Sequence, residues 1–269
     1  MEISILLAEQ ILAMFLTMAV GFGVVRAGLF KTEDSRIISN MVVYICNPCV
    51  VVHSFQIELT DDKIKGLMIA IGLSVVVHMV LIIGSEILSF IFHFNSIEKA
   101  SIIYTNAGYL VIPLVGAVLG EEWVFYTTAF ILVQTVLMWT HGVKLIGQEK
   151  ELNIRKILCN PNVIAMIIGI ALFTLEIRLP TVVDSCVSGF GDMISPASMM
   201  VIGMVIGDVD LKWVFRQKRP YLICLLRLIV FPLIAVVAFA GLERSGIHPD
   251  AEYILMIVLI ATSAPAAAM

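Results

Sequence analysis

Charged residues are scarce in this chain. Aspartate, glutamate, lysine and arginine make up 14% of its 269 residues, whereas a typical soluble domain has about 25%. Hydrophobic residues reach 60%, and they lie in runs too numerous and too long for one soluble core of this size. The composition therefore excludes an ordinary soluble domain and predicts a polytopic membrane protein.

Motifs that would indicate an enzyme are also missing. The sequence has no phosphate-binding loop, metalloprotease helix or serine nucleophile elbow. The CNPC sequence at 46–49 has the CxxC spacing of redox and zinc sites, but it lies in an apolar run without a second ligand pair. The GFGD sequence at 189–192 resembles a signature of intramembrane aspartyl proteases, which need a second membrane aspartate. We therefore predict that the chain is not an enzyme and has no metal or cofactor.

Long apolar runs, in contrast, occur repeatedly. A helix needs about 20 mostly apolar residues to cross the hydrocarbon core, and continuous runs favour helices over the alternating strands of a membrane barrel. The first run has no basic region before it, so we expect a permanent helix rather than a signal peptide. The predicted fold class is all-α, with nine spans at 3–25, 37–55, 65–92, 100–119, 123–146, 163–177, 187–206, 221–242 and 252–269.

Lysine and arginine are distributed unevenly between the loops of this topology. One set of connections contains twelve of them and the opposite set contains four. Because the more basic loops lie in the cytoplasm, we expect a plasma (inner) membrane protein whose N-terminus is outside. Arg227 lies about two turns inside a span, the eighth. We expect its long side chain to reach the cytoplasmic surface, and the alternative is that it holds a counter-charge or relays a proton inside the protein.

Prolines interrupt the predicted spans at similar intervals in the two halves of the chain. Pro48 and Pro113 are 65 residues apart, and Pro196 and Pro265 are 69 residues apart. This spacing predicts a duplicated unit of five helices, and a unit with an odd number of spans is inserted upside down the second time. Broken helices at matching positions of inverted repeats indicate the binding site of a transporter.

The predicted domains follow from this repeat. Residues 1–147 form the first five-helix repeat, residues 148–159 a cytoplasmic linker, and residues 160–269 a second repeat that is truncated in helix 9. By this count a tenth helix would follow Met269, so we expect the chain to be a fragment.

The sequence TNAGYLVIPLV, at 105–115, is the main candidate for a binding site. Pro113 removes a backbone donor, Gly108 loosens the helix and Asn106 adds an amide. Where a helix unwinds, the next half-helix presents free N–H groups and a partial positive charge, which suits a carboxylate. The structural alternative is a proline kink in which Asn106 bonds to a neighbouring helix.

The ninth span has a matching break in ATSAPAAAM, at 261–269. We expect the broken fourth and ninth helices to cross at the membrane centre. The predicted substrate-binding residues are Asn106, Gly108, Pro113, Thr262, Ser263 and Pro265, and the predicted supporting breaks are Asn47, Pro48, Ser195 and Pro196.

Ionisable and amide side chains inside the spans are costly if they face lipid, so they should face the protein interior or water. His78 and Glu86 are eight residues apart on roughly one face of a helix, which makes them a candidate pair for proton coupling. The other such residues are Gln134, His141 and Arg227.

These motifs together resemble the auxin efflux carrier family, which includes plant auxin exporters and bacterial malate or malonate permeases. The resemblance covers essentially the whole chain and implies ten helices in two inverted repeats, a crossover of helices 4 and 9, and elevator-like movement. Val111 departs from the family pattern, in which a second glycine precedes the proline. The resemblance rests on Asn106, Gly108 and Pro113, on Asn47 and Pro48, on CNPN at 159–162, and on the alanine-rich segment at Pro265.

We therefore expect a secondary active or facilitative transporter of a small organic anion, a carboxylate such as malate, malonate or an auxin-like acid. The expected partners are the lipid bilayer, H⁺ or Na⁺ as a coupled ion, and a second copy of the chain in a homodimer. We expect no nucleic-acid partner. One alternative is a sodium-coupled symporter of the bile-acid type, which would need a cage of oxygen ligands. Another is a membrane sensor that binds the anion without transporting it.

Overall fold

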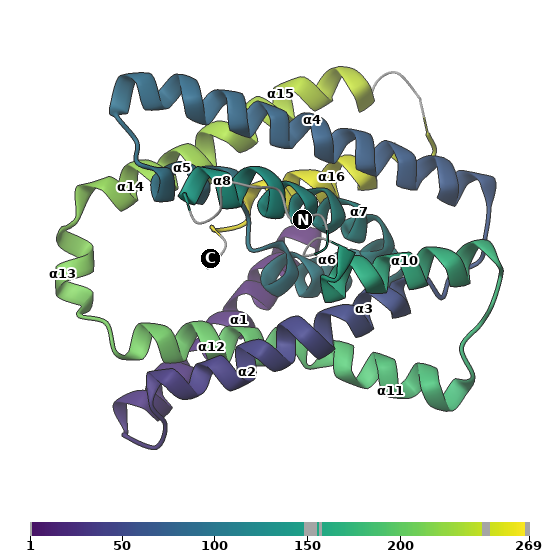
Figure 1. Cartoon of the computed structure of the whole chain (residues 1–269), viewed down its shortest axis with the longest axis horizontal. Helices are drawn as coiled ribbons and strands as arrows, with labels where there is room; N and C mark the ends of the chain where they lie inside the picture. Colours follow the sequence, from purple (N-terminus) through teal and green to yellow (C-terminus); the bar gives the residue numbers. More distant parts are fainter. Residues whose placement is uncertain (1, 148–154, 156–157, 244–247, 267–269) are drawn as a thin grey trace. The chain divides into compact units, whose positions relative to one another are not determined.

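The computed structural model describes residues 2–147, 155, 158–243 and 248–266, in which the regular secondary structure is helical (Figure 1). The α-helices are α1 (Glu2–Arg26), α2 (Ser35–Met41), α3 (Asn47–Ser54), α4 (Asp61–Phe92), α5 (Ser96–Ile103), α6 (Ile112–Leu119), α7 (Val124–Leu137), α8 (Val143–Ile146), α10 (Pro161–Thr174), α11 (Thr181–Asp192), α12 (Ile194–Gly207), α13 (Leu211–Arg216), α14 (Lys218–Leu225), α15 (Phe231–Glu243) and α16 (Ala251–Ser263). Short 3₁₀ turns are η1 (Thr32–Asp34) and η4 (Glu121–Trp123), and π-helical turns are η2 (Val42–Cys46), η3 (Ala107–Val111), η5 (Met138–Gly142) and η6 (Leu226–Val230).

The all-α prediction is confirmed, and the apolar helices make this a multi-pass membrane protein. Large apolar side chains such as Phe90 and Val182 are more than four-fifths exposed, as side chains in contact with lipid are. The predicted linker at 148–159 lies mostly outside the described residues, and so do the last three residues of the predicted ninth span. Six helical stretches are long and apolar enough to cross a membrane, namely Ala8–Arg26, Thr32–Ser54, Asp61–Phe92, Glu121–Ile146, Thr181–Gly207 and Lys218–Phe239, and three apolar helices are shorter, namely Ala107–Leu119, Pro161–Thr174 and Ala251–Ser263.

The chain divides into two compact units, each of which takes segments from both halves of the sequence. Neither unit coincides with one predicted repeat, and the inverted repeat stays a prediction. Unit 1 contains Met1–Ile57, Gly108–Val124 and Ile164–Lys218, and unit 2 contains Glu58–Ala107, Phe125–Val163 and Arg219–Met269.

Within unit 1, α1 and α12 cross at very close range (Figure 1). A Cβ added at Gly21 would overlap the carbonyl oxygen of Met200, and one added at Gly203 would overlap that of Met18. Small residues at such a crossing let two backbones approach in a membrane, where packing drives helix association.

Within unit 2, the 32-residue helix α4 packs against α5 and α16. Thr60 caps its N-terminus by accepting a hydrogen bond from the Lys63 N–H over 3.2 Å. His93 ends it in the left-handed conformation, with φ of 52°. Midway along the helix, His78 is fully buried, and its ring centroid lies 4.8 Å from that of Phe130.

The prolines in the spans have different local effects. Three of the four π-helical turns in the described residues precede a proline, at Pro48, Pro113 and Pro232. Proline has no N–H to donate, and an extra residue in the turn lets the helix continue around that gap. The second predicted span is therefore a continuous helical stretch at Pro48. Pro196 lies in the first turn of α12, where an N–H has no partner within the helix in any case.

Candidate functional site

The fourth and ninth apolar helices both lose helical geometry at a short extended segment. In the fourth helix this segment is 104–106, between α5 and η3, and in the ninth it is 264–266, directly after α16. The two segments form an antiparallel bridge, in which the Asn106 N–H donates a hydrogen bond to the Pro265 carbonyl over 2.8 Å. We call these two segments the crossover.

Gln134 of α7 satisfies the backbone of the crossover. Its Oε1 accepts hydrogen bonds from the N–H and the hydroxyl of Thr105, both over 2.9 Å, and its Nε2 donates to the Thr105 carbonyl over 2.8 Å. Next to it, the buried Tyr104 hydroxyl lies 2.8 Å from Nδ1 of His141. Extended backbone inside a membrane protein needs such partners because lipid offers none.

Arg227 of η6 connects the two broken helices. Its Nε donates to the Ala264 carbonyl over 2.8 Å, and its Nη1 donates to the carbonyls of Ser101, over 3.0 Å, and Ile102. These carbonyls lie at the C-terminal ends of α16 and α5, where helices have unpaired acceptors and a partial negative charge. The expectation that Arg227 reaches the cytoplasmic surface is wrong, because the residue is only 2% exposed.

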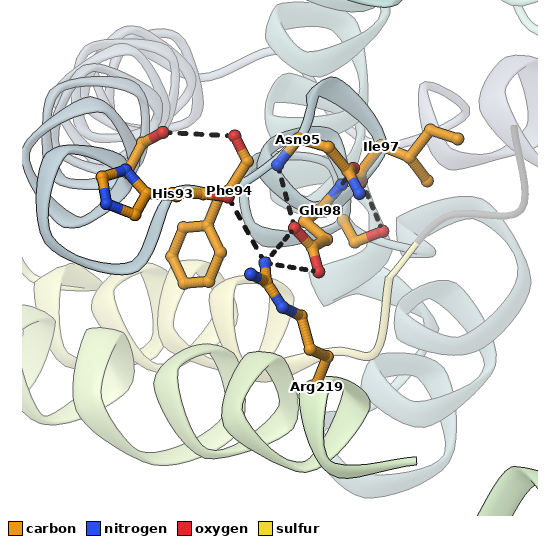
Figure 2. A network of polar contacts seen from close by, with 8 residues as sticks. His93, Phe94, Asn95, Ile97, Glu98 and Arg219 are labelled. Atoms are coloured by element: carbon orange, nitrogen blue, oxygen red, sulfur yellow. Dashed lines mark hydrogen bonds and ion pairs between the residues drawn. The ribbon is translucent and has the colours of Figure 1, made fainter.

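Arg219 of α14 has more ordinary surroundings (Figure 2). Its Nη1 donates to both carboxylate oxygens of Glu98, over 3.1 and 2.8 Å, and to the His93 carbonyl over 3.3 Å. Glu98 also accepts a hydrogen bond from the Asn95 N–H over 2.9 Å, which completes a capping box at the start of α5. The Arg219 side chain is 55% exposed, so this arginine has both an acidic partner, Glu98, and access to solvent.

The predicted ligands at the crossover differ in how available they are. The Asn106 side chain is half-buried and has no hydrogen-bond partner among the described residues. The hydroxyls of Thr262 and Ser263, in contrast, donate to carbonyls one turn back in α16, over 2.7 and 2.8 Å. In this conformation Asn106 can donate to a ligand, whereas both hydroxyl protons are already used.

Gly108 and Pro113 belong to unit 1, where other predicted residues surround them. A Cβ at Gly108 would lie 3.0 Å from Nδ2 of Asn47, so a larger residue here would displace the Asn47 amide by a few tenths of an ångström. The Tyr109 carbonyl, which would accept an N–H from residue 113 in a regular helix, lies 3.1 Å from the Ser198 hydroxyl. This hydroxyl shares its single proton with the carbonyls of Ile194, at 2.5 Å, and Ser195, at 3.2 Å. Asn47 is buried, and its Oδ1 has no hydrogen-bond partner.

Unit 1 also contains a cavity of about 430 Å³, which Pro113 and Ser195 help to line. His53 Nδ1 and Asp184 Oδ1 lie 2.8 Å apart at its wall. This lining favours cations over a carboxylate. The four acidic residues of the wall are Glu121, Glu122, Asp184 and Asp192.

The structure gives His78 and Glu86 separate partners. His78 Nδ1 lies 2.7 Å from the Ser74 carbonyl, whereas Glu86 forms an ion pair with Lys99 over 2.7 Å. Eight residues correspond to about 12 Å along an α-helix. Their role in proton coupling stays a prediction.

Sequence reasoning placed Gln134 and Arg227 among the polar residues that should face the protein interior, but it did not assign them to the crossover, which they hold together. The available signal was their position inside apolar spans, because polar side chains there rarely face lipid. It could not name their partners, which come from helices distant in the sequence.

The comparisons agree with the resemblance seen in the motifs. A family model described as membrane transport protein matches residues 6–269. The search of curated proteins finds no match to the chain.

Proposed function

This chain belongs to the membrane transport protein family, the auxin efflux carrier family, and we propose that it carries a small organic anion across the plasma membrane. The substrate is a carboxylate of the size of malate, malonate or an auxin-like acid. Transport is driven by the gradients of the substrate or of a coupled ion, or by the membrane potential.

The observation that carries this proposal is the pairing of two broken helices at the crossover. Non-helical backbone at membrane depth is tolerated where it is buried in protein or lines a water-filled cavity, and transporters build binding sites from such breaks. Here the Asn106 N–H bonds Pro265 across two segments that are about 160 residues apart in the sequence. In our proposal the substrate binds at this junction.

The chemistry around Asn106 suits a carboxylate. The half-buried side-chain amide supplies N–H donors. The helical turn η3 begins at the next residue, Ala107, and the first N–H groups of a helix have no internal acceptor. Together these groups present donors and a partial positive charge to one anionic ligand.

The two compact units support an elevator-type mechanism. An elevator needs one body that carries the substrate and another that stays fixed, and each unit here combines segments from both halves of the chain. In our proposal unit 2, which contains the crossover, is the transport body and unit 1 is the scaffold. The N-terminus lies outside, and the scaffold forms a homodimer.

Proteoliposomes containing the full-length protein test this function. We expect saturable counterflow of labelled malate, malonate or indole-3-acetate, and at least a tenfold rise in KM for Asn106→Ala because one charge-assisted donor is lost, worth about 1.5–3 kcal/mol. Asn40→Ala is the matched control, since Asn40 is exposed on α2. Saturable binding without flux would favour a sensor, and an unchanged KM in Asn106→Ala would place the site elsewhere.

A further inference from the structure

We propose that Arg227 is a built-in cation of the crossover: it occupies the position of a coupling sodium ion and binds the substrate carboxylate through its free Nη2. The inference rests on the proposed function, because it names the charged group of the same site. It predicts that transport does not depend on sodium.

The first step is the geometry of the carbonyl oxygens. Carbonyls at two half-helix ends, those of Ser101, Ile102 and Ala264, converge on one guanidinium group. In transporters with broken helices, unwound carbonyls and C-terminal half-helix ends are the groups that coordinate sodium. In this chain the Arg227 guanidinium uses those oxygens as its own acceptors, so they are not available to sodium.

The second step is the missing counter-charge. Arg227 is 2% exposed, and the Nη2 atom is buried without a hydrogen-bond partner. Among the described residues, no acidic side chain forms an ion pair with it. A buried cation is stable when it is paired and all its donors are satisfied, and backbone carbonyls supply only partial charge.

The third step is the fit of the ligand. Guanidinium binds carboxylate through directed N–H donors, and these charge-assisted bonds are about twice as strong as neutral ones. Arg219 shows the paired state in the same unit, since its Nη1 contacts both oxygens of Glu98 (Figure 2). Arg227 has the same chemistry without an acidic partner, and a ligand carboxylate would provide it.

The test measures counterflow of labelled malonate in proteoliposomes that contain the full-length protein, in sodium buffer and in potassium buffer. We expect equal flux in the two buffers. In Arg227→Gln we expect KM to rise about 30-fold, and in Arg227→Lys about tenfold, because lysine keeps the charge but loses the directed fork. Arg219→Gln is the matched control and should leave KM unchanged within about twofold.

A second readout separates ligand binding from support of the fold. Malonate should raise the melting temperature of the wild-type protein, whereas the uncharged malonamide should not. Folded, monodisperse Arg227→Gln should lose most of this preference for the charged ligand, whereas Arg227→Lys, which keeps the charge, should retain part of it. Loss of a purely structural arginine would leave the preference intact.

The outcomes distinguish the two proposals. Wild-type flux that requires sodium, or a folded Arg227→Gln protein with unchanged KM and unchanged preference for malonate, would overturn the role of Arg227 alone. Wild-type protein without saturable flux of malonate, malate or indole-3-acetate in either buffer would overturn the proposed function, and this inference with it.

Discussion

The crossover of unit 2 and the cavity of unit 1 both lie beside a proline, yet they collect opposite charges. The crossover contains Pro265 and the buried cation Arg227, without an acidic partner among the described residues. The cavity is lined by Pro113 and by four acidic residues, with His53 paired to one of them. A helix break thus determines where backbone N–H and C=O groups lack helical partners. The charge of the side chains that surround the break determines whether a cation or an anion can bind there.

Volume and charge favour different regions for the anion that we propose as the substrate. The cavity of about 430 Å³ is within the usual range for a small-molecule pocket, about 300–1,000 Å³. Its acidic wall, however, repels a carboxylate, whereas the crossover presents donors and a positive charge. Charge therefore decides between the two regions, and three substitutions sharpen or break this comparison.

The largest effect is expected at Gln134. In Gln134→Ala the buried N–H and carbonyl of Thr105 lose their partners, and each unsatisfied group costs about 1–3 kcal/mol. We expect a loss of about 3 kcal/mol in stability and the loss of flux. Thermal unfolding in detergent and counterflow measure the two effects.

Gln10→Ala is the matched control in the other region, because Gln10 lines the cavity of unit 1. We expect it to change stability by less than about 0.5 kcal/mol. Equal destabilisation by the two substitutions would contradict the view that the crossover depends on its polar partners more than the cavity does.

The sequence predicted the crossover better than the residues that hold it. Proline and glycine act on their own backbone, so the break at Pro265 can be read locally. At Pro113 the helix continues after a π-helical turn, and the fourth helix is broken at 104–106 instead. The paired segments at Asn106 and Pro265 lie where the two broken helices were expected to cross. A break in a helix depends on the backbone hydrogen bonds of a few adjacent residues, so the sequence of those residues indicates where it can occur.

Partners from distant helices could not be predicted in this way. The apolar surroundings of Gln134 and Arg227 show that these side chains must be satisfied, but not by which atoms. Pro48 follows a π-helical turn in the same way, and there too the helix continues. The presence of a proline alone does not predict whether the helix ends or continues through a π-helical turn. The outcome depends on whether a neighbouring group can donate a hydrogen bond to the carbonyl that the proline leaves unpaired.

An intermediate effect is expected at Ser198, whose hydroxyl is within hydrogen-bond distance of the carbonyl that Pro113 leaves without its usual donor, as well as of two carbonyls in its own helix. Ser198→Ala should reduce stability by about 1 kcal/mol, the typical net value of one hydrogen bond. In a Pro113→Ala background the new N–H at residue 113 can bond the Tyr109 carbonyl, so the same substitution should cost less. Thermal unfolding of the single and double variants gives the coupling energy, and strict additivity would show that Ser198 does not compensate for the proline.

The smallest effect is expected at Asp184, which is paired with His53 at the cavity wall. Both side chains are about one-third exposed, and exposed ion pairs contribute about 0–1 kcal/mol. Asp184→Asn also removes one negative charge from a wall that repels carboxylates, so KM for malonate should stay the same or fall by less than about threefold. A rise in KM of tenfold or more would mean that the anion binds in the cavity, and it would reverse the assignment of the two regions.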